Sequence, residues 1–203
     1  EERRKELVKE VKKMAEEAGV HYLTREGGEQ AKAGMIKAAF SGKGCTDVAP
    51  DANGVFYGSG FVKTQGELIL MLDCDHIPTR DMPKTVVGHF SNPKVFLVQT
   101  PHFMLNADPL RKNLQGEHRI PCESWLFYMG IQKGLDTWDA SFFCGSAAFL
   151  RRKALEEVGG LCGETITEDA ETALALHGRG YSSVYVEKPM VAGLAPESVP
   201  DML

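Results

Sequence analysis

The feature that most constrains the fold is a short apolar run that ends in two carboxylates and a histidine. The run extends from Leu68 to Leu72, and Asp73, Asp75 and His76 follow it at once. An apolar run this short predicts a strand buried on both faces of a sheet, although a helix over the same residues stays open. If the run is a strand, both aspartates leave its carboxyl end, where open α/β sheets bind ligands.

The two aspartates predict a site for a divalent metal ion. Asp73 and Asp75 are one residue apart, so their charges repel each other and oppose joint ionisation. A bound Mg²⁺ or Mn²⁺ removes that conflict, and these ions favour carboxylate oxygens with phosphate oxygens completing the shell. The functional interpretation is a metal–diphosphate site. The structural alternative, a polar strand end followed by a proline turn at residues 77–79, stays open because isolated D-x-D sequences are common.

Composition limits the class of protein. The 203 residues fit one domain, and 43% hydrophobic with 25% charged residues is ordinary for a chain that buries a core. The net charge of −5 argues against a nucleic-acid partner, because phosphate binding needs a basic surface. The five cysteines contain no C-x-x-C pair, which favours a reducing compartment over a disulfide framework or zinc ribbon. No apolar run approaches the roughly 20 residues of a membrane span.

Helical and strand patterns alternate along the chain and predict an α/β fold with a mixed, mostly parallel sheet flanked by helices. The expected helices cover residues 1–18, 30–40, 81–90, part of 119–134, 153–158 and 165–179. The expected strands cover residues 20–24, 68–72, 95–100 and 183–186. Residues 102–109 are expected to form a loop. Residues 41–65 are rich in glycine and lack a helical period, which predicts an insertion loop within the single domain 1–203.

A further carboxylate pair lies at the start of the helix expected over residues 165–179. Thr165 and Glu168 have the spacing of a capping box, and Asp169 follows in the first turn. One interpretation is a favourable interaction of these charges with the helix dipole. The other is that a carboxylate held there acts as a general base on an attacking hydroxyl. The sequence by itself leaves both open.

Several other polar or aromatic residues have both a structural and a functional interpretation. Cys144-Gly145-Ser146 interrupts an apolar run, and glycine inside a strand marks either a bulge or the close approach of a ligand or backbone. Cys144 is not expected to be a nucleophile, since no base lies near it in sequence. His76 and His102 follow strand ends, where a lone histidine is more often structural. The aromatic residues Trp125, Phe127 and Tyr128 are expected in the core rather than in a sugar platform.

Four separated segments occur in a characteristic order. They are Gln30-Ala-Lys32-Ala-Gly34; Asp73-Cys-Asp75-His76; Gln99-Thr-Pro-His102-Phe with Asn106-Ala-Asp-Pro109; and Phe142-Phe-Cys144-Gly145-Ser146 with Thr165-Ile-Thr167-Glu168-Asp169. Together they resemble the catalytic domain of processive family-2 glycosyltransferases, and in particular that of bacterial cellulose synthases. The resemblance covers nearly the whole chain except residues 41–65, and the set is far more specific than any single motif.

The resemblance implies a GT-A-type fold, truncated at both ends, and a reaction that transfers glucose from UDP-glucose to the 4-hydroxyl of a growing β-1,4-glucan with inversion. It implies that Asp73 and Asp75 hold Mg²⁺ or Mn²⁺ on the diphosphate and that Asp169 is the general base. It places Lys32 with the donor nucleotide and the segment around Cys144 at the acceptor end. The implied substrate-binding residues are Lys32, Gly34, Asp73, His76, His102, Cys144, Gly145, Ser146, Thr167 and Glu168.

The chain also departs from the family pattern. Met35 stands where the family usually has asparagine, and the family's early Asp-Asp-Gly and later Gln-x-x-Arg-Trp motifs are not in the sequence. The resemblance therefore implies a soluble part, inactive alone, of a longer enzyme at the cytoplasmic face of the bacterial inner membrane. Its implied partners are UDP-glucose, the β-glucan acceptor, membrane helices and an accessory periplasmic subunit.

Three alternatives stay open. A haloacid-dehalogenase-like phosphatase also uses a D-x-D at a strand end, but Ile77 occupies the position where that family has threonine or valine. A domain that binds a nucleotide sugar or an assembly partner without catalysis is the alternative outside enzymes. Synthases of other β-glucans, such as curdlan, share the same motifs, so the linkage is less firmly implied than the reaction.

Overall fold

The computed structural model describes residues 2–20, 22–25, 34–36, 45–47, 66–114, 119, 121 and 123–198. The chain divides into two compact units: Glu1–Gln65 with Gly159–Ile166, and Gly66–Val158 with Thr167–Leu203. The organisation as one domain with an insertion stays a prediction. Apart from residues 45–47, the expected insertion lies outside the described residues.

The first unit begins with the expected amphipathic helix, α1 (Glu2–Ala18). Gly19 follows it with a φ of +65°, a left-handed conformation that glycine adopts without a steric penalty and that ends the helix as predicted. Strand β1 (Leu23–Arg25) pairs antiparallel with β2 (Cys45–Asp47), which lies inside the segment expected to be an irregular loop. Residues 34–36 are helical, within the helix expected over 30–40.

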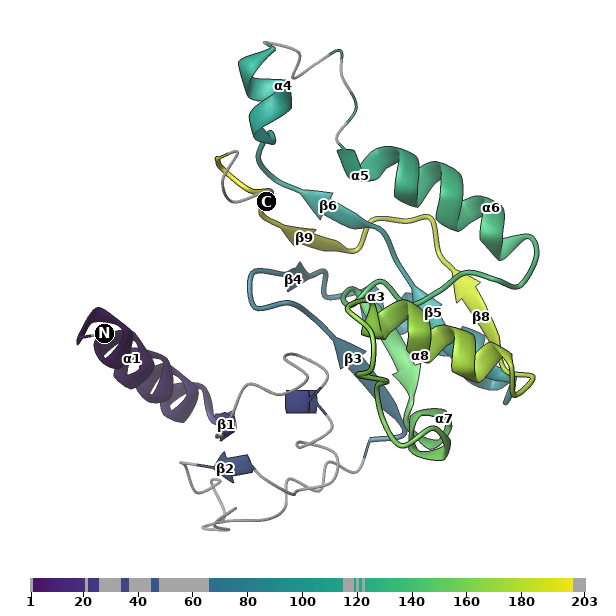
Figure 1. Ribbon diagram of the computed structural model, residues 1–203, viewed down its shortest axis with the longest axis horizontal. Helices are drawn as coiled ribbons and strands as arrows, with labels where there is room; N and C mark the ends of the chain where they lie inside the picture. Colours follow the sequence, from purple (N-terminus) through teal and green to yellow (C-terminus); the bar gives the residue numbers. More distant parts are fainter. Residues whose placement is uncertain are drawn as a thin grey trace. The chain divides into compact units, whose positions relative to one another are not determined.

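The second unit is built on a four-stranded sheet of order β3-β7-β5-β8 (Figure 1). Its strands are β3 (Leu68–Met71), β5 (Val95–Gln99), β7 (Ala148–Arg151) and β8 (Ser182–Tyr185). Strand β7 is antiparallel to both β3 and β5, whereas β5 and β8 are parallel. Strands β3, β5 and β8 therefore point the same way, with one opposing strand between them. This arrangement confirms the mixed α/β class.

The core of this unit follows the apolar runs of the sequence. Every residue of β5 is buried. The buried cluster around it consists of Met82, Val86, Phe90, Val95, Val98, Ala147, Phe149, Met190 and Val191. Strand β3 is mostly half-buried, because it lies at the edge of the described sheet. The prediction that this strand is buried on both faces was therefore wrong.

The helices of the second unit are short, and several contact the sheet. They are α3 (Met82–Val86), the 3-10 helix η1 (Val87–Ser91), α4 (Pro109–Asn113), α5 (Glu123–Trp125), the π-helix η2 (Leu126–Gln132), α6 (Lys133–Asp136), α7 (Arg152–Glu157) and α8 (Glu168–His177). Helix α6 contacts β8, α7 contacts β7 and η1 contacts β5. Helices therefore flank the sheet, as the pattern of alternating elements predicted.

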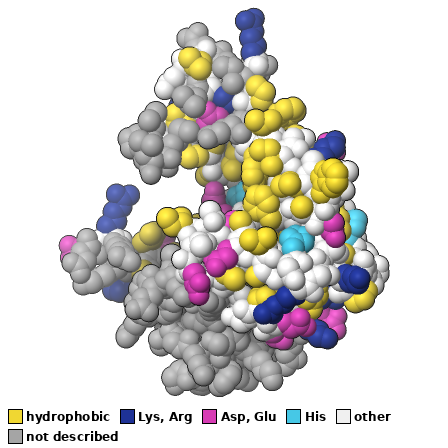
Figure 2. Space-filling model, turned by 45° about the vertical axis from the view of Figure 1, so that its right-hand side comes forward, with side chains coloured by type: hydrophobic (Ala, Val, Ile, Leu, Met, Phe, Trp, Pro, Cys, Tyr) yellow, Lys and Arg dark blue, Asp and Glu magenta, His cyan; other side chains and the backbone are white. Residues whose placement is uncertain are grey.

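Three local expectations about the helices were wrong. The N-cap of α8 is Thr167 and not Thr165, and its side chain makes no capping hydrogen bond, so Glu168 is the first residue of the helix rather than the third. The helix expected over residues 81–90 ends as an α-helix at Val86 and continues in 3-10 geometry from Val87, which is 52% exposed. Trp125 was expected in the core and is 52% exposed. Figure 2 shows hydrophobic side chains gathered on one face of the molecule.

A second, three-stranded sheet has the order β4-β9-β6. It consists of β4 (Ile77–Pro78), β9 (Val191–Gly193) and β6 (His102–Met104), with β9 antiparallel to β4 and parallel to β6. The sequence left a turn at the first of these segments open as an alternative and predicted a loop over residues 102–109. That loop was wrong at residues 102–104, because a strand of three residues carries no detectable alternation. Within the described ranges, no helix has the length and apolarity to cross a membrane.

Candidate functional site

The two carboxylates of the D-x-D sequence lie just beyond the carboxyl end of β3, as predicted. The main-chain N–H of His76 donates to the carbonyl of Asp73 at 3.0 Å and closes a turn over residues 73–76. Asp73 is half-buried, whereas Asp75 is exposed. The Asp75 Oδ2 atom accepts a hydrogen bond from the N–H of Leu194, just after β9, at 3.2 Å. The second sheet therefore supports one side of this turn.

The loop formed by residues 142–147 supports the other side of the turn. Ser146 is fully buried, and its Oγ accepts a hydrogen bond from the N–H of Asp73 at 2.8 Å. The same Oγ lies 2.6 Å from Nδ1 of His76. The sequence singled out this serine and the glycine before it, and the structure brings the serine to the D-x-D turn.

The 142–147 loop has an unusual backbone. Gly145 has a φ of +77° and Ala147 a φ of +53°, so Ser146 lies between two left-handed residues. An alanine in that region is uncommon and needs support from its surroundings. Thr100 gives that support, because its N–H and its hydroxyl both donate to the carbonyl of Ala147, at 3.1 and 2.8 Å.

Two buried glutamines hold the same loop from different elements. Gln99, the last residue of β5, accepts the N–H of Cys144 at 3.0 Å and donates to the carbonyl of Ser146 at 2.9 Å. Gln132, the last residue of the π-helix, accepts the N–H of Phe142 at 3.3 Å and donates to Sγ of Cys144 at 3.0 Å. Such π segments are frequent at functional sites. Sequence analysis assigned no role to either glutamine, although a glutamine that ends a buried apolar run was a signal at position 99.

The two predicted histidines lie together. The rings of His76 and His102 are 4.7 Å apart between centroids and meet edge to face. The Nε2 atom of His102 lies 3.1 Å from the carbonyl oxygen of Ser146. Tyr128, expected only as a core residue, stacks at a tilt on His102 with centroids 4.9 Å apart. His76 therefore lies at the hydroxyl of Ser146, and His102 lies at its carbonyl oxygen.

Asp169 lies in the first turn of α8, and its charge acts on the 142–147 loop. Burial, followed by the charge of Asp169, raises the pKa of the Cys144 thiol well above its usual range. Burial and nearby charges, including those of Asp169 and Asp73, also raise the pKa of Tyr128. Cys144 and Tyr128 are therefore protonated at neutral pH, which agrees with the expectation that Cys144 is no nucleophile. The charges of Asp73 and Asp169, which are far apart in sequence, therefore both act on Tyr128.

Gly193 in β9 is a site residue that sequence analysis missed. A Cβ placed there would lie 2.4 Å from Cδ2 and 2.7 Å from Nε2 of His76. Real Cβ atoms essentially never approach that closely, so the imidazole needs a glycine beside it. No sequence signal distinguished this glycine from the others of the chain.

The remaining predicted residues are Thr167, Glu168, Gly34 and Lys32. The carbonyl of Thr167 accepts the N–H of Glu171, and the carbonyl of Glu168 accepts the hydroxyl of Thr172, as expected for the start of a helix. Gly34 is buried in the helical stretch 34–36 of the first unit. Lys32 lies outside the described residues.

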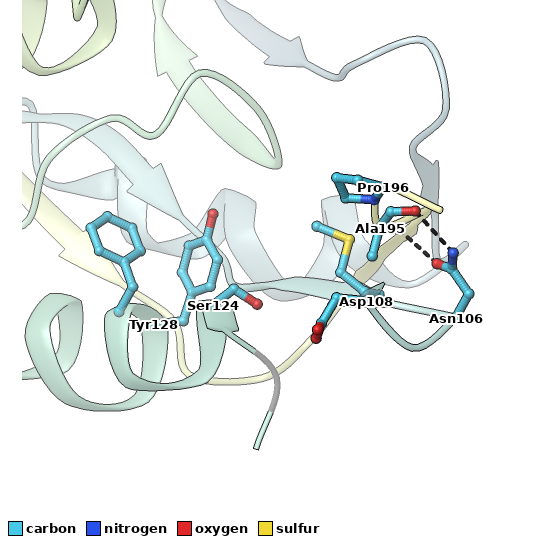
Figure 3. A pocket seen from close by; sticks show the side chains of 8 residues that line it. Asn106, Asp108, Ser124, Tyr128, Ala195 and Pro196 are labelled. Atoms are coloured by element: carbon cyan, nitrogen blue, oxygen red, sulfur yellow. Dashed lines mark hydrogen bonds between the residues drawn. The ribbon is translucent and has the colours of Figure 1, made fainter. Parts of the chain in front are cut away.

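A cavity of about 380 Å³ opens beside the second sheet and the helical segment α5–η2. It is lined by Met104, Asn106, Asp108, Ser124, Phe127, Tyr128, Ala195 and Pro196. Figure 3 shows Asn106 and Ala195 joined by two hydrogen bonds on one side, with Ser124 and Tyr128 on the other. Because Tyr128 contacts both this cavity and His102, the cavity adjoins the site.

The donor set fits a metal ion only if a bound ligand supplies part of the coordination shell. Among the residues that the structure describes, no group of three or more His, Cys, Asp and Glu side chains is placed to hold an ion. Asp73 and Asp75 offer two carboxylates. Mg²⁺ is commonly held by one or two carboxylates together with substrate phosphates. These residues therefore suit an ion shared with a diphosphate.

The sequence is similar to those of several cellulose synthase subunits. It is 42% identical over 94% of its length to a cellulose synthase catalytic subunit (UDP-forming) of Xanthomonas axonopodis, of which it covers 23%. It is 50% identical over 66% of its length to the corresponding subunit of Komagataeibacter sucrofermentans, of which it covers 18%. The chain thus spans about a quarter or less of the length of these relatives.

A solved structure and a family model also match. The mannosyltransferase PcManGT of Pyrobaculum calidifontis, in complex with GDP-Man and Mn²⁺, matches 67% of this chain with a TM-score of 0.47 and 20% identity, and the match covers 34% of that structure. The model of glycosyl transferase family group 2 matches residues 68–203, which include the turn at Asp73, the 142–147 loop and the start of α8. The chain belongs to glycosyl transferase family group 2.

Proposed function

We propose that this chain is part of an enzyme that transfers glucose from UDP-glucose to the 4-hydroxyl of a growing β-1,4-glucan, as in cellulose synthesis. The similarity to UDP-forming cellulose synthase subunits supports the substrate and the reaction. The observation that carries the proposal is that the 142–147 loop binds the main chain of Asp73 through Ser146, while the charge of Asp169 acts on Cys144 of the same loop. One end of that arrangement suits a diphosphate, and the other suits an acceptor hydroxyl.

Asp73 and Asp75 hold Mg²⁺ or Mn²⁺ against the diphosphate of the donor in this proposal. The ion supplies positive charge that stabilises the leaving UDP. Asp169 accepts the proton of the acceptor hydroxyl as its oxygen bonds to the anomeric carbon and the bond to the diphosphate breaks. This single displacement inverts the configuration at that carbon. Cys144 and Tyr128 do not compete as bases, because their raised pKa values keep them protonated.

The other predicted residues complete the proposal. His76, His102, Gly145 and Ser146 shape the donor side, and the face around Cys144 takes the glucan acceptor. Lys32 and Gly34 contribute to the nucleotide site, and Thr167 and Glu168 orient Asp169. In the longer protein, membrane helices at the cytoplasmic face of the bacterial inner membrane and an accessory periplasmic subunit complete the assembly.

Calorimetric titration of UDP into this chain tests the donor half of the proposal. We expect binding with Mn²⁺ that is lost in EDTA. Asp75→Asn is expected to abolish the metal-dependent part of the affinity. Asp169→Asn is the matched control, because it removes one carboxylate charge from the same neighbourhood and is expected to leave UDP binding unchanged. Equal UDP affinity with Mn²⁺ and with EDTA would contradict the assignment of Asp73 and Asp75.

Turnover in the full-length enzyme tests the acceptor half of the proposal, in which Asp169 is the general base. Asp169→Asn is expected to lower kcat by about 10²–10⁴, the usual contribution of a general base, while UDP affinity stays unchanged. Normal turnover in this variant would remove Asp169 from the role of base. Linkage analysis of the product then separates a β-1,4-glucan from curdlan or a mixed-linkage glucan.

A further inference from the structure

We propose that Ser146 is a positioning residue: its hydroxyl fixes the D-x-D turn against the 142–147 loop and thereby sets the place of the carboxylates of the donor side. This inference rests on the proposed function for its meaning. The contacts that carry it are independent of the nature of the sugar.

The first step is the bridging geometry of the hydroxyl. A serine hydroxyl can accept and donate at the same time. Here Oγ of Ser146 accepts from the N–H of Asp73 at 2.8 Å and lies 2.6 Å from Nδ1 of His76. These two partners are the ends of the turn that contains Asp75. One hydroxyl therefore holds both ends of that turn.

The second step is that the serine is fixed independently of the turn it holds. Its carbonyl accepts from Nε2 of Gln99 at 2.9 Å, and the next carbonyl, that of Ala147, accepts twice from Thr100. Both partners are fully buried and belong to, or directly follow, the buried strand β5. These hydrogen bonds therefore hold the loop in place independently of its contact with the D-x-D turn.

The third step is the connection to the other half of the site. Cys144, two residues before Ser146, is bound by Gln99 and Gln132. After burial, the charge of Asp169 is the next cause that raises the pKa of its thiol. The loop thus contacts the donor turn through Ser146, and the charge of Asp169 acts on Cys144 of the same loop.

The fourth step is the support opposite Ser146. The N–H of Leu194 binds Oδ2 of Asp75, and Gly193 leaves room for the ring of His76. Removing the serine hydroxyl removes its contacts with Asp73 and His76, whereas the contacts on this side stay. The turn then keeps its approximate place but loses the restraint at Asp73, which lowers metal-dependent affinity without unfolding the sheet.

The test compares Ser146→Ala with Thr100→Val. Both residues are fully buried, and each variant removes one hydroxyl that binds the same region of the chain, but only the serine hydroxyl touches the D-x-D turn. For both variants and the wild type, we would measure thermal unfolding, amide exchange at Asp73, the imidazole nitrogen resonances of His76, and UDP affinity with Mn²⁺ and with EDTA.

We expect Ser146→Ala to speed amide exchange at Asp73, to shift the Nδ1 resonance of His76 and to weaken Mn²⁺-dependent UDP binding about tenfold. A tenfold change corresponds to about 1.4 kcal/mol, within the range for a lost hydrogen bond to a buried group. Thr100→Val is expected to lower the free energy of unfolding by a similar amount and to leave UDP binding unchanged, because the Thr100 N–H still donates to the carbonyl of Ala147 and Gln99 still holds Ser146.

Two results would overturn the inference: unchanged signals of Asp73 and His76 in Ser146→Ala, or equal losses of UDP affinity in both variants, which would mark a merely structural hydroxyl. Absence of metal-dependent binding in the wild type would instead contradict the proposed function. The resonances of Asp73 and His76 would still decide whether Ser146 holds the turn, because they need no ligand.

Discussion

The two sheets of the second unit differ in what forms them and in what they do. The four-stranded sheet is centred on β5, which is buried along its whole length. The three-stranded sheet has strands of two or three residues, and its side chains Ile77 and Phe103 are 68% and 54% exposed. The first sheet supplies the core, whereas the second supplies the contacts to Asp75 and His76.

This difference teaches that stability and site geometry have separate sources in this molecule. Apolar burial by the long strands holds the unit together. Strands β4 and β6 bury little, but the register of β9 between them places Gly193 and Leu194 against the D-x-D turn. Substitutions in the first sheet should therefore change stability most, and substitutions in the second should change ligand binding more than stability.

The largest expected effect is on stability and comes from replacing one phenylalanine by alanine in each sheet. Phe96→Ala in β5 removes a fully buried ring, and we expect a loss of about 3–5 kcal/mol in the free energy of unfolding. Phe103→Ala in β6 removes a mostly exposed ring and should change that free energy by no more than about 0.5 kcal/mol. Urea denaturation measures both. Equal losses would mean that the second sheet is part of the same core.

An intermediate effect is expected for Gly193→Ala. The added Cβ would meet the ring of His76, and overpacking of this kind costs about 1–3 kcal/mol. Because the ring must shift away from Gly193 and its contact with Ser146 is then disturbed, we expect Mn²⁺-dependent UDP affinity to fall about tenfold, an estimate from the loss of one hydrogen bond. Calorimetry and thermal unfolding measure the two effects.

Gly134→Ala is the matched control for that variant. A Cβ at Gly134 in α6 meets nothing within 4 Å, so this substitution should leave binding unchanged and stabilise the helix by up to about 1 kcal/mol. Unchanged UDP binding in Gly193→Ala would show that the second sheet does not position His76.

The smallest effect concerns an exposed ion pair that flanks the second sheet. Lys188 binds Asp81 at 2.8 Å, and this contact lowers the pKa of Asp81 to about 2 from 3.8. A depressed pKa means that the pair contributes stability above about pH 4, and that this contribution disappears as the pH falls through about 2. Lys188→Met should raise the pKa of Asp81 towards its ordinary value, which a carboxyl NMR titration would detect. A titration midpoint near 2 in the variant would exclude Lys188 as the cause.

Much of the fold was predictable because burial leaves a local pattern. The apolar runs that became β3 and β5 were found in sequence, and so was the position of Asp73 and Asp75 beyond the first of them. Strand β6 was missed because three residues show no periodicity, and its pairing depends on β9, far along the chain. The exposure of Trp125 was missed because an aromatic residue in a helix is apolar whichever way it faces.

The candidate site divides in the same way. The motif around Cys144 pointed to the loop, but the partners of Ser146 lie 73 and 70 residues away in sequence and follow from no local pattern. Gln132 and Gly193 carried no signal at all. Their roles depend on which atoms they contact, and the residue type alone does not predict those contacts.

The sequence by itself determined the class of the fold, the chemical set of carboxylates and histidines, and the family. It did so because strand burial and motif spacing are local properties of the chain. Tertiary structure alone decided that one loop, held by two buried glutamines, contacts the donor turn through Ser146 and lies within reach of the charge of Asp169. The physical reason is that hydrogen bonds between remote segments depend on how the sheets pack, and that packing is a property of the whole unit.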